Sequence, residues 1–463
     1  MKLTYLAIAA IFFTAITETV SAQTVIRIAG ATTYRAPVHK AIMDTLDSGY
    51  TYAYDEPTGN VYKAGEAIFK GTLNVSGHPS VIIKTYWTGS MAGLIDLCQQ
   101  NNLTKWMANA VTTSAAGTNL NGTGYSTETA PCQAVMSDSA QGSVAASVST
   151  AVGGSTVANT INNMSLSDAG ASAGQYQTVG IAPFEWVLGK IGSGTAPFTN
   201  ITQQSAYSLA QGPLAVALLS GSAADQYKYV FLVGRNEDSG TRIGTLAEAQ
   251  TGFGQSVVQY QLSFSNNQKT QADGLATGGT GSAVTGLYLW PANSPLYTNS
   301  SINWNTAGHS GYIAGGDVAN VLNSTNPVTG LTVGNSQNPT PTPTGMTAGY
   351  FVGYLGIADA TSTVGTTALS YNGVPYSVVA VQTGRYTLWS FEHMYYISAG
   401  VNALTGTGKT TADTVADKIF TTDAPTNSSG TTLAGQANAA GILYDSNVLV
   451  TRSVEGGAVS QDY

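Results

Sequence analysis

Charged residues are scarce in this sequence. Only 9% of its 463 residues are Asp, Glu, Lys or Arg, against roughly 25% in an average soluble protein. The 25 acidic residues outnumber the 17 basic ones, which gives a net charge of -8. A nucleic-acid interface needs clustered positive charge, so we expect no nucleic-acid partner. Apolar residues make up 43% of the chain, which is enough for a core and excludes a chain that is disordered throughout.

Cysteine and histidine are also scarce. Cys98 and Cys132 are the two cysteines, and they could form a disulfide in an oxidising compartment or remain two separately buried thiols. The four histidines are scattered, so we expect no metal site and no cofactor. The sequence has no Gly-x-Ser-x-Gly elbow, and nothing ties a histidine to Ser239 or a neighbouring hydroxyl. We therefore expect that the protein is not an enzyme.

The first 22 residues contain a long apolar run. Lys2 gives a positive start, residues 3–16 are almost all apolar, and residues 20–22 form a small-x-small cleavage site. This pattern predicts a cleaved signal peptide. The alternative is a membrane anchor, but the run is shorter than the ~20 residues that a span needs. No cysteine lies beside the cleavage site, so we expect a periplasmic or extracellular protein without a lipid anchor.

Strand-like and helix-like segments alternate along the chain. Such alternation predicts an α/β protein with mostly parallel sheets and flanking helices. The expected strands lie at 24–29, 80–87, 134–138, 179–188, 227–233, 350–357 and 376–381, and the expected helices at 36–46, 91–98, 140–148, 205–220 and 410–419. Residues 152–174 are rich in Gly, Ser and Asn and are expected to form a loop, and residues 252–345 read as a long, loop-rich insertion.

Four segments place small hydroxyl or carboxylate residues where a strand ends and a helix begins. They are residues 30–33, 88–90, 137–139 and 238–241. A helix start has free backbone N–H groups that attract anions, and glycine lets a ligand approach the backbone closely. One such segment alone would be an ordinary helix cap. Four of them together with Arg235, whose guanidinium can grip an oxyanion at two points, favour an oxyanion site.

These segments resemble, in order and spacing, those of phosphate-binding proteins of ABC uptake systems. The strongest match is Arg235 followed by Ser239, Gly240 and Thr241; residues 30–32, 89–90, 137–138 and 352–356 also match. Residues 33–35 depart from the family's Phe-Pro, Met91 and Ala92 replace two glycines, and the insertion at 252–345 has no counterpart. The resemblance spans most of the chain.

The resemblance implies a type II periplasmic-binding fold, in which two lobes are joined by two crossing hinge strands and hold the anion between them. Lobe I would comprise residues 23–178 and 385–463, and lobe II residues 179–384 with the insertion. By position, Glu237 would support Arg235, and the phosphate ligands would be Thr32, Thr33, Ser90, Asp138, Arg235, Ser239, Gly240 and Thr241.

Asp138 would select phosphate over sulfate. A buried carboxylate accepts a hydrogen bond from a protonated phosphate oxygen, whereas fully ionised sulfate repels it. The expected function is an exported solute-binding protein that captures phosphate or a similar tetrahedral oxyanion for an ABC permease. The alternative is a cell-surface or matrix structural protein that keeps the two-lobe fold with lost or altered ligand binding, which the low charge and the Gly/Ser/Thr-rich insertion favour.

Overall fold

The computed structural model describes most of the chain. The described residues are 23–100, 105–149, 154–170, 178–191, 194–255, 257–264, 284–290, 311–323, 332–333, 343, 345–420 and 449–461. The expected signal peptide and much of the expected insertion lie outside them. None of the helices in the described part is both long enough and apolar enough to span a membrane.

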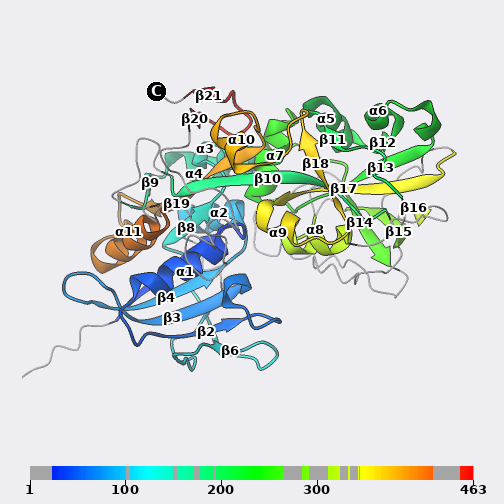
Figure 1. Cartoon of the computed structure of the whole chain (residues 1–463). Coiled ribbons are helices and arrows are strands. Elements are labelled where there is room, and N and C mark those ends of the chain that lie inside the picture. The colour runs from blue at the N-terminus through cyan, green and yellow to red at the C-terminus, as the bar shows by residue number, and fades with distance from the viewer. Residues whose placement is uncertain are drawn as a thin grey trace, which may run out of the picture.

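The first half of the chain forms one lobe, in which strands and helices alternate as the sequence predicts (Figure 1). Its elements are β1 (Thr24–Gly30), α1 (Arg35–Thr45), β2 (Thr51–Asp55), the 3-10 turn Val61–Lys63, β3 (Glu66–Thr72), β4 (Ser80–Tyr86), α2 (Ser90–Gln99), β5 (Lys105–Met107), β6 (Thr118–Asn119), β7 (Thr127–Thr129), β8 (Ala134–Ser137), α3 (Gln141–Ser149), α4 (Gly154–Asn163) and β9 (Leu166–Asp168).

The second half begins with the long strand β10 and forms most of the other lobe. Its elements are β10 (Gly180–Leu188), β11 (Asn200–Ile201), α5 (Gln203–Gln211), β12 (Leu214–Ala215), α6 (Ala217–Ser220), the 3-10 turn Ala223–Asp225, β13 (Lys228–Val233), α7 (Gly240–Glu248), β14 (Tyr260–Phe264), β15 (Val284–Leu289), α8 (Gly315–Leu322), β16 (Thr332–Val333), β17 (Ala348–Gly356), α9 (Ile357–Thr361), β18 (Thr367–Tyr371), α10 (Val378–Gln382), β19 (Trp389–Ile397), α11 (Gly406–Phe420), β20 (Val450–Thr451) and β21 (Ser460–Gln461).

One mixed sheet runs through both lobes. Its main strand order is β12-β13-β17-β10-β19-β8-β1-β4-β3-β2-β6. β1 pairs in parallel with β4 and β8, and β13 pairs in parallel with β17, while β10 and β19 run antiparallel to their neighbours. The α/β class with flanking helices is therefore confirmed, and β10 reaches from one lobe into the other, whereas β19 pairs with β8, β9 and the first part of β10 (Figure 1). The expected lobe boundaries stay predictions.

Strand β10 changes partners at its midpoint. All nine of its residues are buried, as is typical of strands covered on both faces. Residues Gly180 to Pro183 pair with β19, whereas Phe184 to Leu188 pair with β17. Pro183 has no backbone N–H and sits where the ladder passes from one partner to the other, a place at which a missing donor is tolerated. β10 thereby joins the two lobes through continuous backbone pairing.

The structure differs from the prediction in three elements. Residues 152–174 contain α4 and β9 rather than only a loop, and α4 buries Val157 and Ile161 in the core that α2 and α3 share. Residues 376–381 contribute to α10, which the Ser377 side chain caps, instead of forming a strand. The expected helix at 205–220 is divided into α5 and α6 by the short strand β12.

The described parts of the expected insertion are structured. β14, β15 and β16 form a three-stranded sheet. Tyr260, Trp290, Tyr312 and helix α8 share a buried core with residues of β13 and β17. The insertion is thus packed against the second lobe at these points, and its residues 311–313 reach the candidate site described below.

The two cysteines do not form a disulfide. Cys98 and Cys132 are both free and buried in the same apolar cluster. The Cys132 thiol donates instead to the carbonyl of Gly93 at 3.7 Å. Burial raises the pKa of the Cys98 thiol to about 12, so this thiol is neutral and unreactive where it lies.

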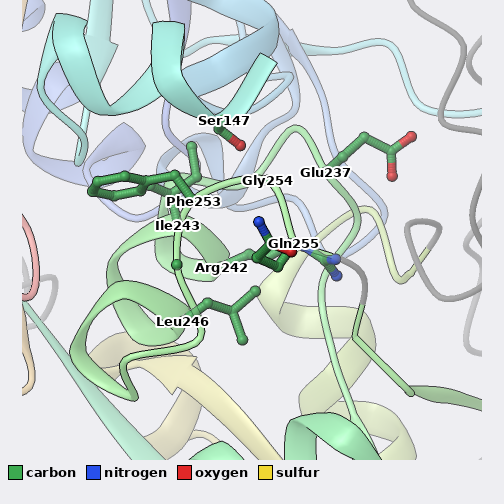
Figure 2. Close-up of a pocket in the computed structure, with 9 residues that line it drawn as sticks. Ser147, Glu237, Arg242, Ile243, Leu246, Phe253, Gly254 and Gln255 are labelled. Atoms are coloured by element: carbon green, nitrogen blue, oxygen red, sulfur yellow. The ribbon is translucent and has the colours of Figure 1, made fainter. Parts of the chain in front are cut away.

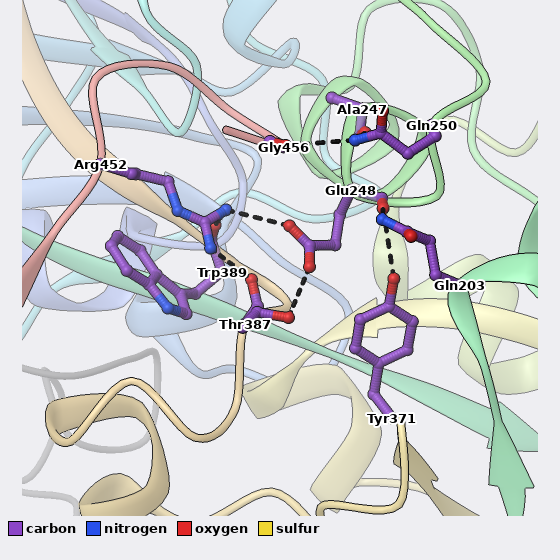
Figure 3. A network of polar contacts seen from close by, with 9 residues as sticks. All are labelled: Gln203, Ala247, Glu248, Gln250, Tyr371, Thr387, Trp389, Arg452 and Gly456. Carbon is purple, nitrogen blue, oxygen red and sulfur yellow. Dashed lines mark hydrogen bonds and ion pairs between the residues drawn. The ribbon is translucent and has the colours of Figure 1, made fainter. Parts of the chain in front are cut away.

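The C-terminal segment at 449–461 contacts both lobes. Arg452 forms an ion pair of 3.2 Å with Glu248 at the end of α7, lies over the Trp389 ring and donates to the Trp389 carbonyl at 3.1 Å (Figure 3). Glu455 accepts hydrogen bonds from the Ala140 backbone N–H and from Ser143 at the start of α3. The segment therefore connects α3 of the first lobe to α7 of the second.

Candidate functional site

Three of the four predicted turns meet at one edge of the sheet. β1, β4 and β8 are parallel neighbours, so their carboxyl ends lie side by side. Gly30 has φ of 124°, and a Cβ there would lie 1.9 Å from the Met136 carbonyl oxygen, so only glycine fits. The Gly89 N–H donates to the Gly30 carbonyl at 2.8 Å and fixes the second turn against the first.

The fourth turn approaches from the other lobe. The N–H of Met91 donates to the Asp238 carbonyl at 3.0 Å. A Cβ on Gly89 would lie 2.4 Å from the Asp238 carbonyl oxygen, and one on Gly240 would lie 1.7 Å from Oδ1 of Asp138. Side chains at these two positions would hold the turns apart, so the glycines allow the backbones of the two lobes to touch.

The turns meet around a small cavity that has no room for a water molecule as the lobes stand. All eight predicted ligand residues line it, together with two neighbours: Ala31, Thr32, Thr33, Gly89, Ser90, Asp138, Arg235, Ser239, Gly240 and Thr241. The structure therefore brings together residues that are up to about two hundred positions apart in the chain. Their binding role stays a prediction, because their convergence alone identifies no ligand.

Asp138 is the acceptor at the centre of the cavity. It is 1% exposed. Ser90 donates to its Oδ1, and Thr241 of the other lobe donates to its Oδ2 at 3.1 Å. Burial raises the pKa of Asp138, while these two hydrogen bonds and the charge of Arg235 act in the opposite direction. A carboxylate has about four acceptor positions, so it can still accept from a protonated ligand oxygen.

Arg235 is the buried cation of the site. Its side chain is held by two backbone carbonyls of the insertion: Nε donates to Tyr312 at 3.2 Å and Nη2 to Ile313 at 2.6 Å. Nη1 makes no hydrogen bond within the described part of the chain and stays available. Burial lowers the pKa of Arg235, and nearby carboxylates, Asp359 and Asp138 first, partly offset this effect.

Glu237 does not support Arg235, which corrects the prediction. Neither of its carboxylate oxygens has a hydrogen-bond partner, although the residue is 3% exposed. It lines a separate small cavity of about 10 Å³ with Arg242 and Phe253 (Figure 2). Burial, and next the neighbouring Asp238, raise its pKa to about 8. The carbonyls of Tyr312 and Ile313 take the role that was expected of Glu237.

Of the remaining predicted residues, one caps a helix and two line the cavity with hydroxyls that make no hydrogen bond to the described residues. Ser239 is the cap of α7, because its hydroxyl accepts from the Arg242 N–H at 3.2 Å. The hydroxyls of Thr32 and Thr33 make no hydrogen bond with the described residues and line the cavity. They can therefore donate to a bound oxyanion without breaking an existing contact.

Sequence reasoning left Arg35 open between a cation at the cleft and a solvent-facing residue, and it missed three other charged residues beside the cavity. A cleft of about 490 Å³ adjoins it, and Arg35, Glu56, Lys63 and Asp359 line this cleft. Burial is the largest effect on Asp359 and raises its pKa, while the charges of Arg35 and Arg235 lower it. The sequence offered one signal for these residues, the placement of Arg35 directly after the first turn.

No family model matches the chain, and no curated protein matches it. Among solved structures, it is similar to an ABC-type phosphate transport receptor from Vibrio cholerae, at 12% identity over 86% of this chain and 97% of that chain, with a TM-score of 0.36. It is also similar to PstS from Borrelia burgdorferi, at 11% identity over 85% and 97%, with a TM-score of 0.30. A third similar structure is a DING protein, at 12% identity over 90% and 91%, with a TM-score of 0.36.

Proposed function

We propose that this chain is an exported solute-binding protein that captures inorganic phosphate in the cavity between the lobes and delivers it to an ABC permease. The observation that carries the proposal is the composition of the cavity wall. Thr32 and Thr33, the cation Arg235 and the acceptor Asp138 all line the pocket where the turns meet. As the lobes stand the pocket has no room for a water molecule, so phosphate enters only when the lobes separate.

The wall chemistry fits a tetrahedral oxyanion that still carries a proton. Such an ion loses its hydration shell on entry, so each oxygen needs a donor from the protein. Hydroxyls and Arg235 supply donors, and Asp138 needs a donor from the ligand. Phosphate provides that proton and sulfate does not, so phosphate is favoured. The periplasmic or extracellular location, the cleaved signal peptide and the permease partner belong to this proposal.

A thermal-shift titration tests the proposal. The protein is first unfolded, dialysed and refolded to remove any bound ligand. Phosphate should raise the unfolding midpoint with concentration, and sulfate at matched ionic strength should not. Arg235→Gln should abolish the phosphate response, while Arg385→Gln, at an exposed arginine that lines none of the cavities described above, should keep it. No response of the wild type to phosphate would refute the proposal.

The second candidate is a surface or matrix protein that keeps the fold but no longer binds this ligand. One observation favours it. Ser90 and Thr241 already donate to the two oxygens of Asp138, and the bond from Thr241 holds the lobes in direct contact with no ligand between them. Cell fractionation separates the two candidates: release by osmotic shock supports a solute-binding protein, whereas tight association with the outside of the envelope supports the structural protein.

A further inference from the structure

The C-terminal segment at 449–461, called the C-terminal strap below, lies across the boundary between the lobes. Its strands β20 and β21 pair with each other, so the strap forms a hairpin. Arg452 and Glu455 lie between these strands and are only 6% and 7% exposed. Charged side chains are almost never this buried unless they are paired. The strap is therefore firmly docked on the rest of the protein.

In the second lobe, the strap contacts the end of α7. Arg452 forms a buried ion pair of 3.2 Å with Glu248, the last residue of α7 (Figure 3). Gly456 packs directly on the same helix, because a Cβ at this position would lie 2.4 Å from the carbonyl oxygen of Ala247. Moving the strap away from α7 would break a buried ion pair, which leaves uncompensated charge and is strongly unfavourable.

In the first lobe, the strap contacts the start of α3. Glu455 accepts a hydrogen bond of 2.7 Å from the Ala140 N–H and a second hydrogen bond from the Ser143 hydroxyl. Backbone N–H groups at a helix start have no partner within the helix and carry partial positive charge, so a carboxylate is a favourable acceptor there. The strap thereby links α3 of one lobe to α7 of the other.

These two helices lie next to the hydrogen bond that joins the lobes at the anion pocket. α3 begins at Gln141, directly after the turn that holds Asp138, and Thr241 lies in the first turn of α7. The pocket has no room for a water molecule as the lobes stand. Phosphate can enter only when these two segments move apart, and the strap opposes that movement because it is attached to both helices.

We propose that the C-terminal strap regulates access to the anion pocket by holding the lobes together while the pocket is empty. The inference rests on the proposed function, because it assigns a control to that same site. Release of the strap from α7 frees the lobes to separate, and its return closes the pocket. The strap therefore sets the fraction of molecules in which the pocket is open, and this fraction limits the rate of phosphate binding.

Hydrogen exchange of the refolded, ligand-free protein tests the strap without any ligand. The Met91 N–H donates to the Asp238 carbonyl of the other lobe at 3.0 Å, so its exchange reports separation of the lobes. Gly456→Ala should push the strap off α7 and accelerate exchange at Met91 roughly 5- to 30-fold, the effect of overpacking a tight contact. Gly77→Ala is the matched control, because Gly77 has φ of 84° against 68° at Gly456 but its Cβ meets nothing within 4 Å. The control should leave exchange at Met91 unchanged.

A second variant weakens the strap from the other lobe. Glu455→Gln removes the charge at the start of α3, so it should accelerate exchange at Met91 in the same direction. Amides within β1 and β4 should exchange as in the wild type, which separates opening of the lobes from general unfolding. Unchanged exchange at Met91 in both variants would overturn the proposal.

Stopped-flow fluorescence with inorganic phosphate then relates the strap to binding. Gly456→Ala should bind phosphate faster than the wild type, by a factor similar to its increase in exchange at Met91. Faster exchange without faster phosphate binding would show that the strap does not regulate access and would leave the proposed function standing. If the wild type binds no phosphate, the proposed function fails, and the exchange data alone decide whether the strap holds the lobes together.

Discussion

The hydroxyl of Thr241 donates a hydrogen bond of 3.1 Å to Oδ2 of Asp138, and the two residues belong to different lobes. Asp138 follows β8 of the first lobe, and Thr241 lies in the first turn of α7 in the second. The acceptor that we propose selects phosphate is therefore also a contact between the lobes. A ligand at this site and the closed state are coupled, because both use the same carboxylate.

Asp138→Asn should reduce the selectivity for phosphate over sulfate. The amide keeps the shape of the side chain but can donate, so it no longer requires a proton on the ligand. Phosphate affinity should fall at least about tenfold, in line with about 1.5–3 kcal/mol for a hydrogen bond to a charged group. Competition calorimetry measures both ions. Asp44→Asn, on the outer side of α1, serves as the control and should bind as the wild type does.

Gly240→Ala should separate the two turns. The added methyl group would lie 1.7 Å from Oδ1 of Asp138 and 2.6 Å from Oγ of Ser90, and both atoms are buried. We expect a lower melting temperature and loss of phosphate binding. Gly142→Ala is the matched control: its Cβ meets nothing within 4 Å inside helix α3, so it should stabilise the protein by up to about 1 kcal/mol. Equal melting temperatures for both variants would contradict the contact.

Glu237→Gln should stabilise the protein in alkaline solution. The folded pKa of Glu237 is about 8, above its ordinary value of 4.5, so the folded state holds the proton more tightly than the unfolded state does. Its contribution is complete below about pH 4.5 and is lost as the pH rises through 8. Urea unfolding at pH 9 should show a gain of a few kcal/mol, since one pKa unit corresponds to about 1.4 kcal/mol. At pH 4.5 the two proteins should be nearly equal; the same gain at both values would contradict the account.

His39→Asn should weaken the acid sensitivity of folding. Nε2 of His39 accepts from the Trp87 N–H at 3.0 Å, so the ring is neutral, with Nδ1 donating to the Val61 carbonyl at 2.7 Å. Burial lowers its pKa from 6.5 to about 3. Stability from the neutral ring is complete above about pH 6.5 and is lost as the pH falls toward 3, at up to about 1.4 kcal/mol per pH unit.

The measurement is the free energy of unfolding in urea between pH 4 and 7. The variant should be less stable than the wild type at pH 7, because it loses buried contacts, but its stability should change less with pH. His78→Asn, at an exposed histidine with φ of 40°, a conformation that Asn tolerates, should leave most of the slope in place. A slope in His39→Asn as steep as in the wild type would assign the acid sensitivity to other groups.

Local patterns allowed much of the fold to be predicted. The first three strand-turn-helix units, which begin at β1, β4 and β8, were placed within a few residues of their observed bounds because each has a dense apolar run followed by a helical spacing. Helix α4 escaped prediction because its sequence is rich in Ser, Thr and Asn, and it is stabilised by packing of Val157 and Ile161 instead of by intrinsic propensity.

The candidate site, like the fold, could be predicted only in part. Residues at strand ends could be identified because the edge of a sheet brings them together. The groups that hold the Arg235 side chain could not be identified from the sequence. They are the backbone carbonyls of Tyr312 and Ile313, and every residue has such a carbonyl. Glu237 was assigned by its proximity in sequence, yet it lines a different cavity. Asp359 comes from a helix far along the chain, so no local pattern connected it with Arg35.

Equilibrium dialysis of the refolded protein against radiolabelled phosphate tests the central claim most directly. We predict one phosphate bound per chain, retained against a large molar excess of sulfate, displaced by unlabelled phosphate, and absent in Arg235→Gln. If no phosphate is bound, or if sulfate displaces it as readily as phosphate does, the cavity around Asp138 is not a phosphate site.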